Sequence, residues 1–110
     1  RQSEPTHDLE NLVYLELINR GYRVDIGKNQ KKEIDFVASG YNETYYIQVS
    51  YTIADPQKKE QEISSFRKLD DGYKKIIITM DDDPYSIIDN GYKKIYAVDF
   101  FLNRDSLTLA

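Results

Sequence analysis

The sequence contains no cysteine, and this absence excludes both a disulfide framework and any thiolate metal site. The 110 residues fit one domain, and that domain must be stabilised by its hydrophobic core alone. The sequence also contains a single histidine. A metal site would therefore be built mainly from oxygen ligands, which select hard cations such as Mg²⁺ or Mn²⁺.

Long apolar runs are missing as well. No stretch approaches the roughly 20 residues that span a bilayer, and no secretory signal is visible, so we expect a cytoplasmic protein without a membrane segment. No Gly-rich phosphate loop ending in Lys-Ser/Thr occurs, so ATP hydrolysis would have to be supplied by another segment. The net charge of -4 argues against a protein that coats nucleic acid, although local basic patches stay open.

Capping residues and hydrophobic periodicity predict the elements of the first half. A helix is expected from Asp8 to Arg20, because Thr6 can cap its start and Gly21 can end it. Alternating apolar and polar residues predict three strands. These strands cover residues 22–26, 33–38 and 45–50.

The second half begins with a helix that is capped by Asp55-Pro56 and runs to about Leu69. The apolar run at 75–79 predicts a strand buried on both faces, and a further strand at 95–98 precedes a short helix and a frayed end. The order α-β-β-β-α-β-β predicts an α/β fold with a mixed central sheet flanked by helices.

Polar residues on two neighbouring strands suggest a site. If the hairpin turn centres between Tyr41 and Asn42, Asp35 lies opposite Gln48, with Cβ atoms roughly 5 Å apart. Ser50 shares their face of the sheet. A carboxylate facing an amide oxygen is the start of a divalent-metal site, and the alternative is a sheet face that is merely solvated.

Glu10 adds a second carboxylate. It shares the helical stripe of Val13, Tyr14 and Leu17, which normally faces a core. An unpaired carboxylate is costly to bury, so Glu10 must meet water, a donor or a cation. A rim position that reaches solvent is the alternative. A hard cation held by such oxygens would polarise a phosphoryl oxygen and supply a hydroxide, which is phosphodiester chemistry.

These motifs resemble the PD-(D/E)xK nuclease superfamily, whose core is α-β-β-β-α-β. The matching motifs are Asp8-Leu9-Glu10-Asn11, Glu33-Ile34-Asp35-Phe36-Val37 and Gln48-Val49-Ser50-Tyr51. More closely, the run from about residue 8 to residue 102 resembles the domain of unknown function found C-terminal to AAA+ ATPase modules in prokaryotic proteins.

The resemblance implies a restriction-endonuclease-like fold, DNA as a partner and an AAA+ ATPase module in the same chain. It makes Glu10 the helical acid, Asp35 the central metal ligand and Gln48 the occupant of the second acidic position, around Mg²⁺ or Mn²⁺. Because the sequence starts at Arg1 rather than at methionine, we expect residues 1–110 to be a single C-terminal domain of a longer ATPase-containing protein.

Two departures from the superfamily pattern leave catalysis open. Ser50 falls where the superfamily keeps a catalytic lysine, and losing one such preorganised group costs on the order of 10² to 10³ in rate. Gln48 is neutral, which weakens divalent binding. Lysines from elsewhere could take the missing place, although each of them is also typical of a solvated surface. The candidates are Lys31, Lys32, Lys58 and Lys59.

Three functions follow from these residues. The first is a metal-dependent deoxyribonuclease or a nuclease-derived DNA-binding domain that uses Glu10, Asp35, Gln48 and Ser50. The second is a catalytically inactive nuclease fold that serves regulation or partner recognition, since function belongs to the site and not to the fold. The third is an unrelated α/β binding domain.

Overall fold

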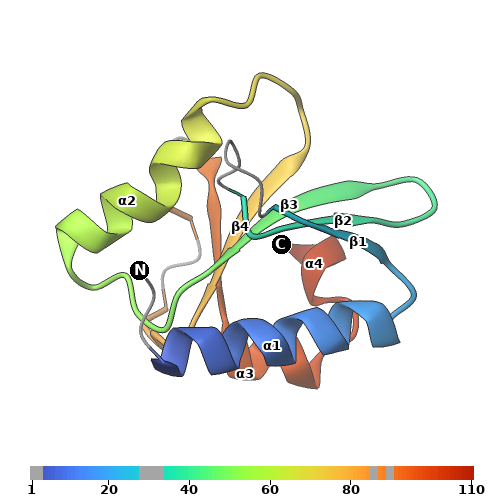
Figure 1. Cartoon of the computed structure of the whole chain (residues 1–110), viewed down its shortest axis with the longest axis horizontal. Helices are drawn as coiled ribbons and strands as arrows, with labels where there is room; N and C mark the ends of the chain where they lie inside the picture. Colours follow the sequence, from blue (N-terminus) through green and yellow to red (C-terminus); the bar gives the residue numbers. More distant parts are fainter. Residues whose placement is uncertain (1–3, 28–33, 85–86, 89–90) are drawn as a thin grey trace.

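The protein has an α/β fold in which a five-stranded mixed sheet separates two layers of helices (Figure 1). This confirms the expected α/β class with a mixed sheet flanked by helices. The computed structural model describes residues 4–27, 34–84, 87–88 and 91–110. The elements are α1 (Glu4–Asn19), β1 (Arg23–Ile26), β2 (Phe36–Ser39), β3 (Thr44–Val49), α2 (Pro56–Arg67), β4 (Lys74–Thr79), β5 (Lys93–Tyr96), α3 (Ala97–Leu102) and α4 (Ser106–Leu109).

The strands lie side by side in chain order. β1, β2 and β3 pair antiparallel, whereas β3, β4 and β5 pair parallel. Parallel neighbours need a crossover connection, and α2 makes it between β3 and β4. In the β2–β3 hairpin Ser39 pairs with Thr44, so the turn centres between Tyr41 and Asn42 as predicted.

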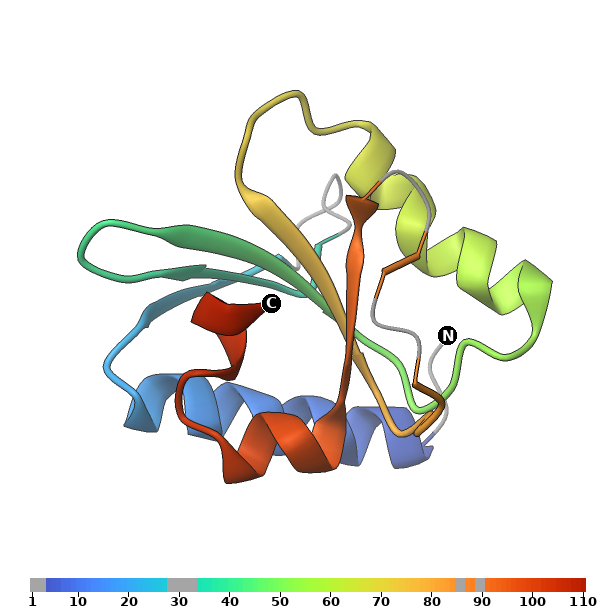
Figure 2. The same cartoon turned by 180° about the vertical axis from the view of Figure 1, so that it is seen from behind.

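Helices cover both faces of the sheet. Figure 2 shows α1 and α3 along one face, with α4 beside them, and α2 on the other. β4 is buried from both sides: Ile76 and Ile78 pack in the cluster that contains the α1 residues, and Ile77 packs in the cluster that contains the α2 residues. The prediction of a doubly buried strand is therefore confirmed. No helix in the described part of the chain is long and apolar enough to cross a membrane.

The start of α1 differs from the sequence prediction. The helix already includes Glu4, so Thr6 is not its N-cap. Pro5 fits in the first turn because the backbone N–H that proline lacks has no partner within the helix there. Thr6 is buried, and its Oγ1 accepts a hydrogen bond of 2.9 Å from the Tyr51 N–H. Glu33, Lys31 and Lys32 lie outside the described residues.

The C-terminal segment also differs. The strand expected at 95–98 ends at Tyr96, and α3 begins at Ala97. The negative charge of Asp99 in the first turn of α3 interacts favourably with the helix dipole. The expectation of a frayed end is wrong, because Leu107 in α4 is fully buried. Its side chain belongs to the same core as α1.

Candidate functional site where α1, β2, β3 and α2 meet

Asp35 and Gln48 lie opposite each other, as the hairpin register predicts. Asp35 donates its backbone N–H to Gln48 Oε1 at 2.7 Å. The Asp35 carboxylate accepts the Val49 N–H at 2.9 Å through Oδ2. The two residues are therefore held together by two side-chain-to-backbone bonds. The carboxylate and the amide oxygen each take a backbone donor from the neighbouring strand.

The Gln48 amide also connects the sheet to α2. Its side chain is buried, with 3% of the residue exposed, and Nε2 donates to the Glu62 carbonyl at 3.0 Å. The alternative of a solvated sheet face is wrong for Gln48 and Ser50, because α2 and its connection cover this side. One amide thus fixes the backbone of Asp35 and the backbone of Glu62 at once.

Glu10 and Asp35 line a common pocket of about 490 Å³ between α1 and the adjoining ends of β1 and β2. His7 lies one turn before Glu10 in the same pocket, with its Nδ1 3.9 Å from Glu10 Oε1. The i, i+3 spacing of His7 and Glu10 on one helix is a sequence signal for this contact. The Glu10 side chain is 17% exposed, so it lines this pocket and also reaches solvent.

The electrostatics of Asp35 are unusual for a carboxylate. Burial raises the pKa of Asp35 to about 8, the hydrogen bond from Val49 opposes this rise, and the charges of Glu10 and Glu62 add to it. A hydrogen bond with the Glu10 side chain raises the pKa further, by favouring the protonated form. Near neutral pH, Asp35 thus keeps a proton unless a cation offsets the neighbouring charges.

Glu62 is a functional candidate that sequence reasoning missed. It is 8% exposed, and burial raises its pKa while Lys58 opposes the rise. Lys58 Nζ lies 3.4 Å from Glu62 Oε2. The signal was available in the sequence, because Glu62 shares the buried stripe of α2 with Ile63 and Phe66, as Glu10 shares one on α1.

Ser50, at the position of the superfamily lysine, is fully buried. Its Oγ donates to the Thr52 carbonyl at 2.9 Å, and its N–H donates to the Ile78 carbonyl at 3.1 Å. The hydroxyl therefore supports the connection from β3 to α2 and brings no charge to the pocket.

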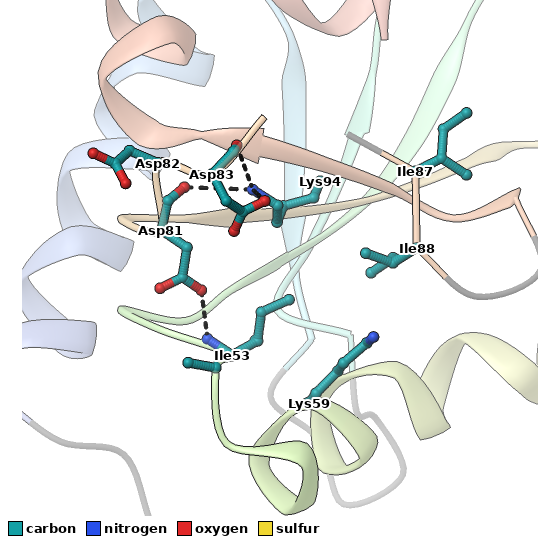
Figure 3. A pocket seen from close by; sticks show the side chains of 9 residues that line it. Ile53, Lys59, Asp81, Asp82, Asp83, Ile87, Ile88 and Lys94 are labelled. Atoms are coloured by element: carbon teal, nitrogen blue, oxygen red, sulfur yellow. Dashed lines mark hydrogen bonds and ion pairs between the residues drawn. The ribbon is translucent and has the colours of Figure 1, made fainter. Parts of the chain in front are cut away.

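Lys59 belongs to a different pocket from Glu10 and Asp35. It lines a cavity of about 780 Å³ beside the turn that follows β4, together with Ile53 (Figure 3). There Lys94 is buried and pairs with Asp83 at 3.2 Å, while Asp81 accepts the Ile53 N–H at 2.8 Å. These contacts anchor the turn to the sheet, so they give Lys94, Asp83 and Asp81 structural roles.

The Glu10 and Asp35 carboxyls bring to one pocket oxygen ligands of the type that hard divalent cations prefer. Gln48 could add its amide oxygen, which has a second lone pair besides the one that meets Asp35. Within the described ranges no three His, Cys, Asp or Glu side chains are grouped so that they could hold a metal ion. Of the expected ligands, Glu10 and Asp35 are the two described carboxyls that line this pocket.

Comparison with known proteins finds a bacterial relative of this chain. An uncharacterized protein of Haemophilus influenzae is 43% identical over 94 residues, which are 86% of this chain. The match covers 22% of the relative, so the chain corresponds to about a fifth of that protein. No family model matches the chain, and no solved structure matches it significantly.

Proposed function

We propose that the chain is a nuclease-like domain of the PD-(D/E)xK type, in which Glu10 and Asp35 hold Mg²⁺ or Mn²⁺ and the site acts on DNA, by binding it or by cleaving its phosphodiesters. One observation carries the proposal: carboxyls from α1 and from the residue before β2 line one pocket, where burial and then the charge of Glu10 raise the pKa of Asp35. The order of the first six elements, α-β-β-β-α-β, also agrees with the core of that superfamily.

Each residue of the proposed site has a distinct role. A bound cation would supply Lewis acidity toward a phosphoryl oxygen and a more acidic water. Val49 fixes Oδ2 of Asp35 through its N–H, and the hydrogen bond between the Asp35 and Glu10 side chains brings the two carboxyls together. Gln48 holds the backbone of Asp35 in place. The proton that Asp35 retains near neutral pH would be released when a cation binds, so affinity should rise with pH.

The second candidate is an inactive nuclease fold used for regulation or partner recognition. The state of Ser50 favours it, because the hydroxyl is buried and donates to the Thr52 carbonyl. Such a group cannot offset the charge that develops in phosphodiester cleavage. Binding of metal or DNA without turnover would agree with this candidate.

The partner proposed with this function is an AAA+ ATPase module in the same chain, in the cytoplasm. The support is the resemblance of residues 8–102 to the domain that follows such modules. The Haemophilus relative has most of its length outside the matched segment, which leaves room for further modules in that protein.

Titration calorimetry with Mn²⁺ tests the metal site directly. We expect the wild type to bind with an affinity that increases between pH 6 and pH 8, because the cation displaces the proton of Asp35. Asp35→Asn and Glu10→Gln should each weaken binding at least tenfold, since each removes a charged ligand. Asp8→Asn is the matched control, because Asp8 is exposed on the same helix.

Incubation of the same proteins with duplex and single-stranded DNA distinguishes the two candidates. Multiple-turnover cleavage that Asp35→Asn abolishes would support the nuclease. Metal binding without cleavage would support the inactive module. Mn²⁺ binding that is equal in wild type and Asp35→Asn would contradict the proposed site in both forms.

A further inference from the structure

Helix α1 carries apolar side chains on two opposite faces. One set is buried in the core, and its members are Leu9, Val13 and Leu17. The other set is exposed to solvent, by 54% at Leu12, 60% at Leu15 and 45% at Ile18. A helix at a protein surface normally directs one apolar stripe to the core and polar residues to water. The outer face of α1 is thus an apolar surface that the described part of this chain leaves uncovered.

The exposed stripe reads the same in both directions along the helix. Residues three apart are neighbours roughly 60° apart around the axis, so the three side chains form one continuous row with Leu15 at its centre. Leu12 and Ile18 lie three residues before and after Leu15. Asn11 and Asn19 lie four residues before and after it, and both are exposed. An interface between two identical copies related by a two-fold axis requires such a self-complementary pattern.

Antiparallel packing of α1 on a second α1 matches these side chains in kind. With the two-fold axis at Leu15, this residue meets Leu15 of the second copy, and Leu12 lies beside Ile18 of the second copy. The asparagine that precedes the stripe in one copy meets the asparagine that follows it in the other. An amide can both donate and accept, so each of these pairs can form a hydrogen bond at the edge of the contact. The dipoles of the two helices run in opposite directions, which is favourable.

Charge does not oppose this pairing. Within residues 11–19 the one charged residue is Glu16, and its carboxylate pairs with Arg20 of the same chain at 2.7 Å. We propose that the outer face of α1 is a self-association surface, on which α1 of a second copy packs antiparallel with Leu15 at the two-fold axis. One helix from each copy forms a contact smaller than the roughly 1,200 Å² of a stable interface, so the dimer dissociates on dilution. Asn11 also lines the pocket of the candidate site, so the second copy lies beside that pocket.

Analytical ultracentrifugation over a wide concentration range tests this surface. We expect the wild type to shift from monomer to dimer as its concentration approaches the millimolar range. Leu15→Lys should weaken association by about a hundredfold or more, because two ammonium groups would face each other in an apolar contact. Ile87→Lys is the matched control and should associate like the wild type, because Ile87 is also 60% exposed but lies in the segment between β4 and β5 (Figure 3).

A mixing experiment tests the position of the two-fold axis. Leu15→Glu alone should be as monomeric as Leu15→Lys. An equimolar mixture of the two variants at low salt should form a heterodimer, because opposite charges meet only if residue 15 of one copy faces residue 15 of the other.

Several results would overturn the proposal. A wild type that stays monomeric at every concentration refutes the self-association. Equal association of Leu15→Lys and the wild type, or equal weakening in Ile87→Lys, refutes α1 as the surface. Two monomeric Leu15 variants that do not associate when mixed refute the antiparallel pairing. Circular dichroism verifies that each variant is folded, and Leu15→Ala, which adds no charge, keeps the comparison valid if a charged variant is unstable.

Discussion

The pKa of the Asp35 carboxyl depends strongly on the groups around it. In water an aspartate ionises near pH 3.8, whereas here burial and the nearby acids raise its pKa to about 8. The hydrogen bond from Val49 opposes this effect without cancelling it. The raised pKa means that a positive charge beside Asp35, whether a proton or a cation, is favourable at neutral pH.

This pKa predicts how stability depends on pH. Between about pH 4 and pH 8 the folded protein holds a proton that the unfolded chain has released, so raising the pH in this window destabilises the fold. The loss is at most about 1.4 kcal/mol per pH unit. Asp35→Asn cannot ionise but still accepts the Val49 N–H, so its stability should fall less steeply.

Urea unfolding at several pH values across this window measures the difference. Some slope should remain in Asp35→Asn, because the pKa of Glu62 is raised as well. Asp8→Asn, which changes an exposed carboxylate on α1, should follow the wild type. Parallel curves for the wild type and Asp35→Asn would refute the raised pKa.

At the scale of elements, single polar side chains join pieces that are far apart in the chain. Gln48 in β3 links Asp35, just before β2, to α2, and Arg20 links the end of α1 to α3 and α4. In both cases the partners include backbone groups, so the bonds hold the backbone of a helix or strand in place and not only a partner side chain.

Gln48→Ala should destabilise the protein by about 2 to 4 kcal/mol, because it removes the acceptor of the Asp35 N–H, the bond to the Glu62 carbonyl and the buried volume of the side chain. Gln61→Ala changes an exposed glutamine on the same helix and should stay within about 0.5 kcal/mol of the wild type. Chemical denaturation provides both values. Equal stability of the two variants would show that the bridge carries no net energy.

Arg20→Ala should cost about 3 kcal/mol. The guanidinium side chain is 2% exposed, pairs with Glu16 at 2.7 Å and donates to the Phe100 carbonyl and to Ser106. Arg20→Lys should recover little, because an ammonium cannot reproduce this fork of donors.

Arg23→Ala is the control for the Arg20 variants. It removes an exposed arginine whose Asp25 partner lies at 3.9 Å, and such a surface pair contributes little. A loss for Arg20→Ala no larger than for Arg23→Ala would contradict the role given to Arg20.

At the scale of the whole molecule, β4 joins the two cores. Ile77 and Ile78 are neighbours in sequence, fully buried on opposite faces of one strand. Ile77→Ala and Ile78→Ala should each destabilise by about 2 to 5 kcal/mol, because each leaves a cavity in a different layer. Unfolding should remain a single transition when followed by far-UV circular dichroism and by tyrosine fluorescence. An early, separate transition in Ile77→Ala would show that the α2 layer unfolds alone.

Much of this architecture could be predicted from the sequence, because local signals and the fold agree. The Asp55-Pro56 cap starts α2 as expected, and the alternation around Gly40 fixes the register that pairs Asp35 with Gln48. The apolar run of β4 indicated burial on both faces. These signals lie within a few residues of the elements that they specify.

The parts that could not be predicted depend on contacts between distant segments. The first turn of α1 is attached to the segment after β3 by the hydrogen bond between Thr6 and Tyr51. The last residues form a helix because Leu107 is buried in the core that contains the α1 residues. Glu62 joins the candidate site only because the crossover places α2 over β3. Hairpin register placed Asp35 and Gln48, but it carries no information about what covers them.

The crossover has a consequence for how such a domain can vary. The first carboxylates come from α1 and the hairpin, whereas Glu62 and Lys58 arrive on a helix tethered by the segment between β3 and Asp55. Lengthening that connection by a residue or two would move Glu62 and Lys58 relative to the carboxyls of Glu10 and Asp35. The strand pairing would stay intact. The spacing between the carboxyls of Glu10 and Asp35 and the Lys58–Glu62 pair is thus set by a connection that takes no part in the strand pairing.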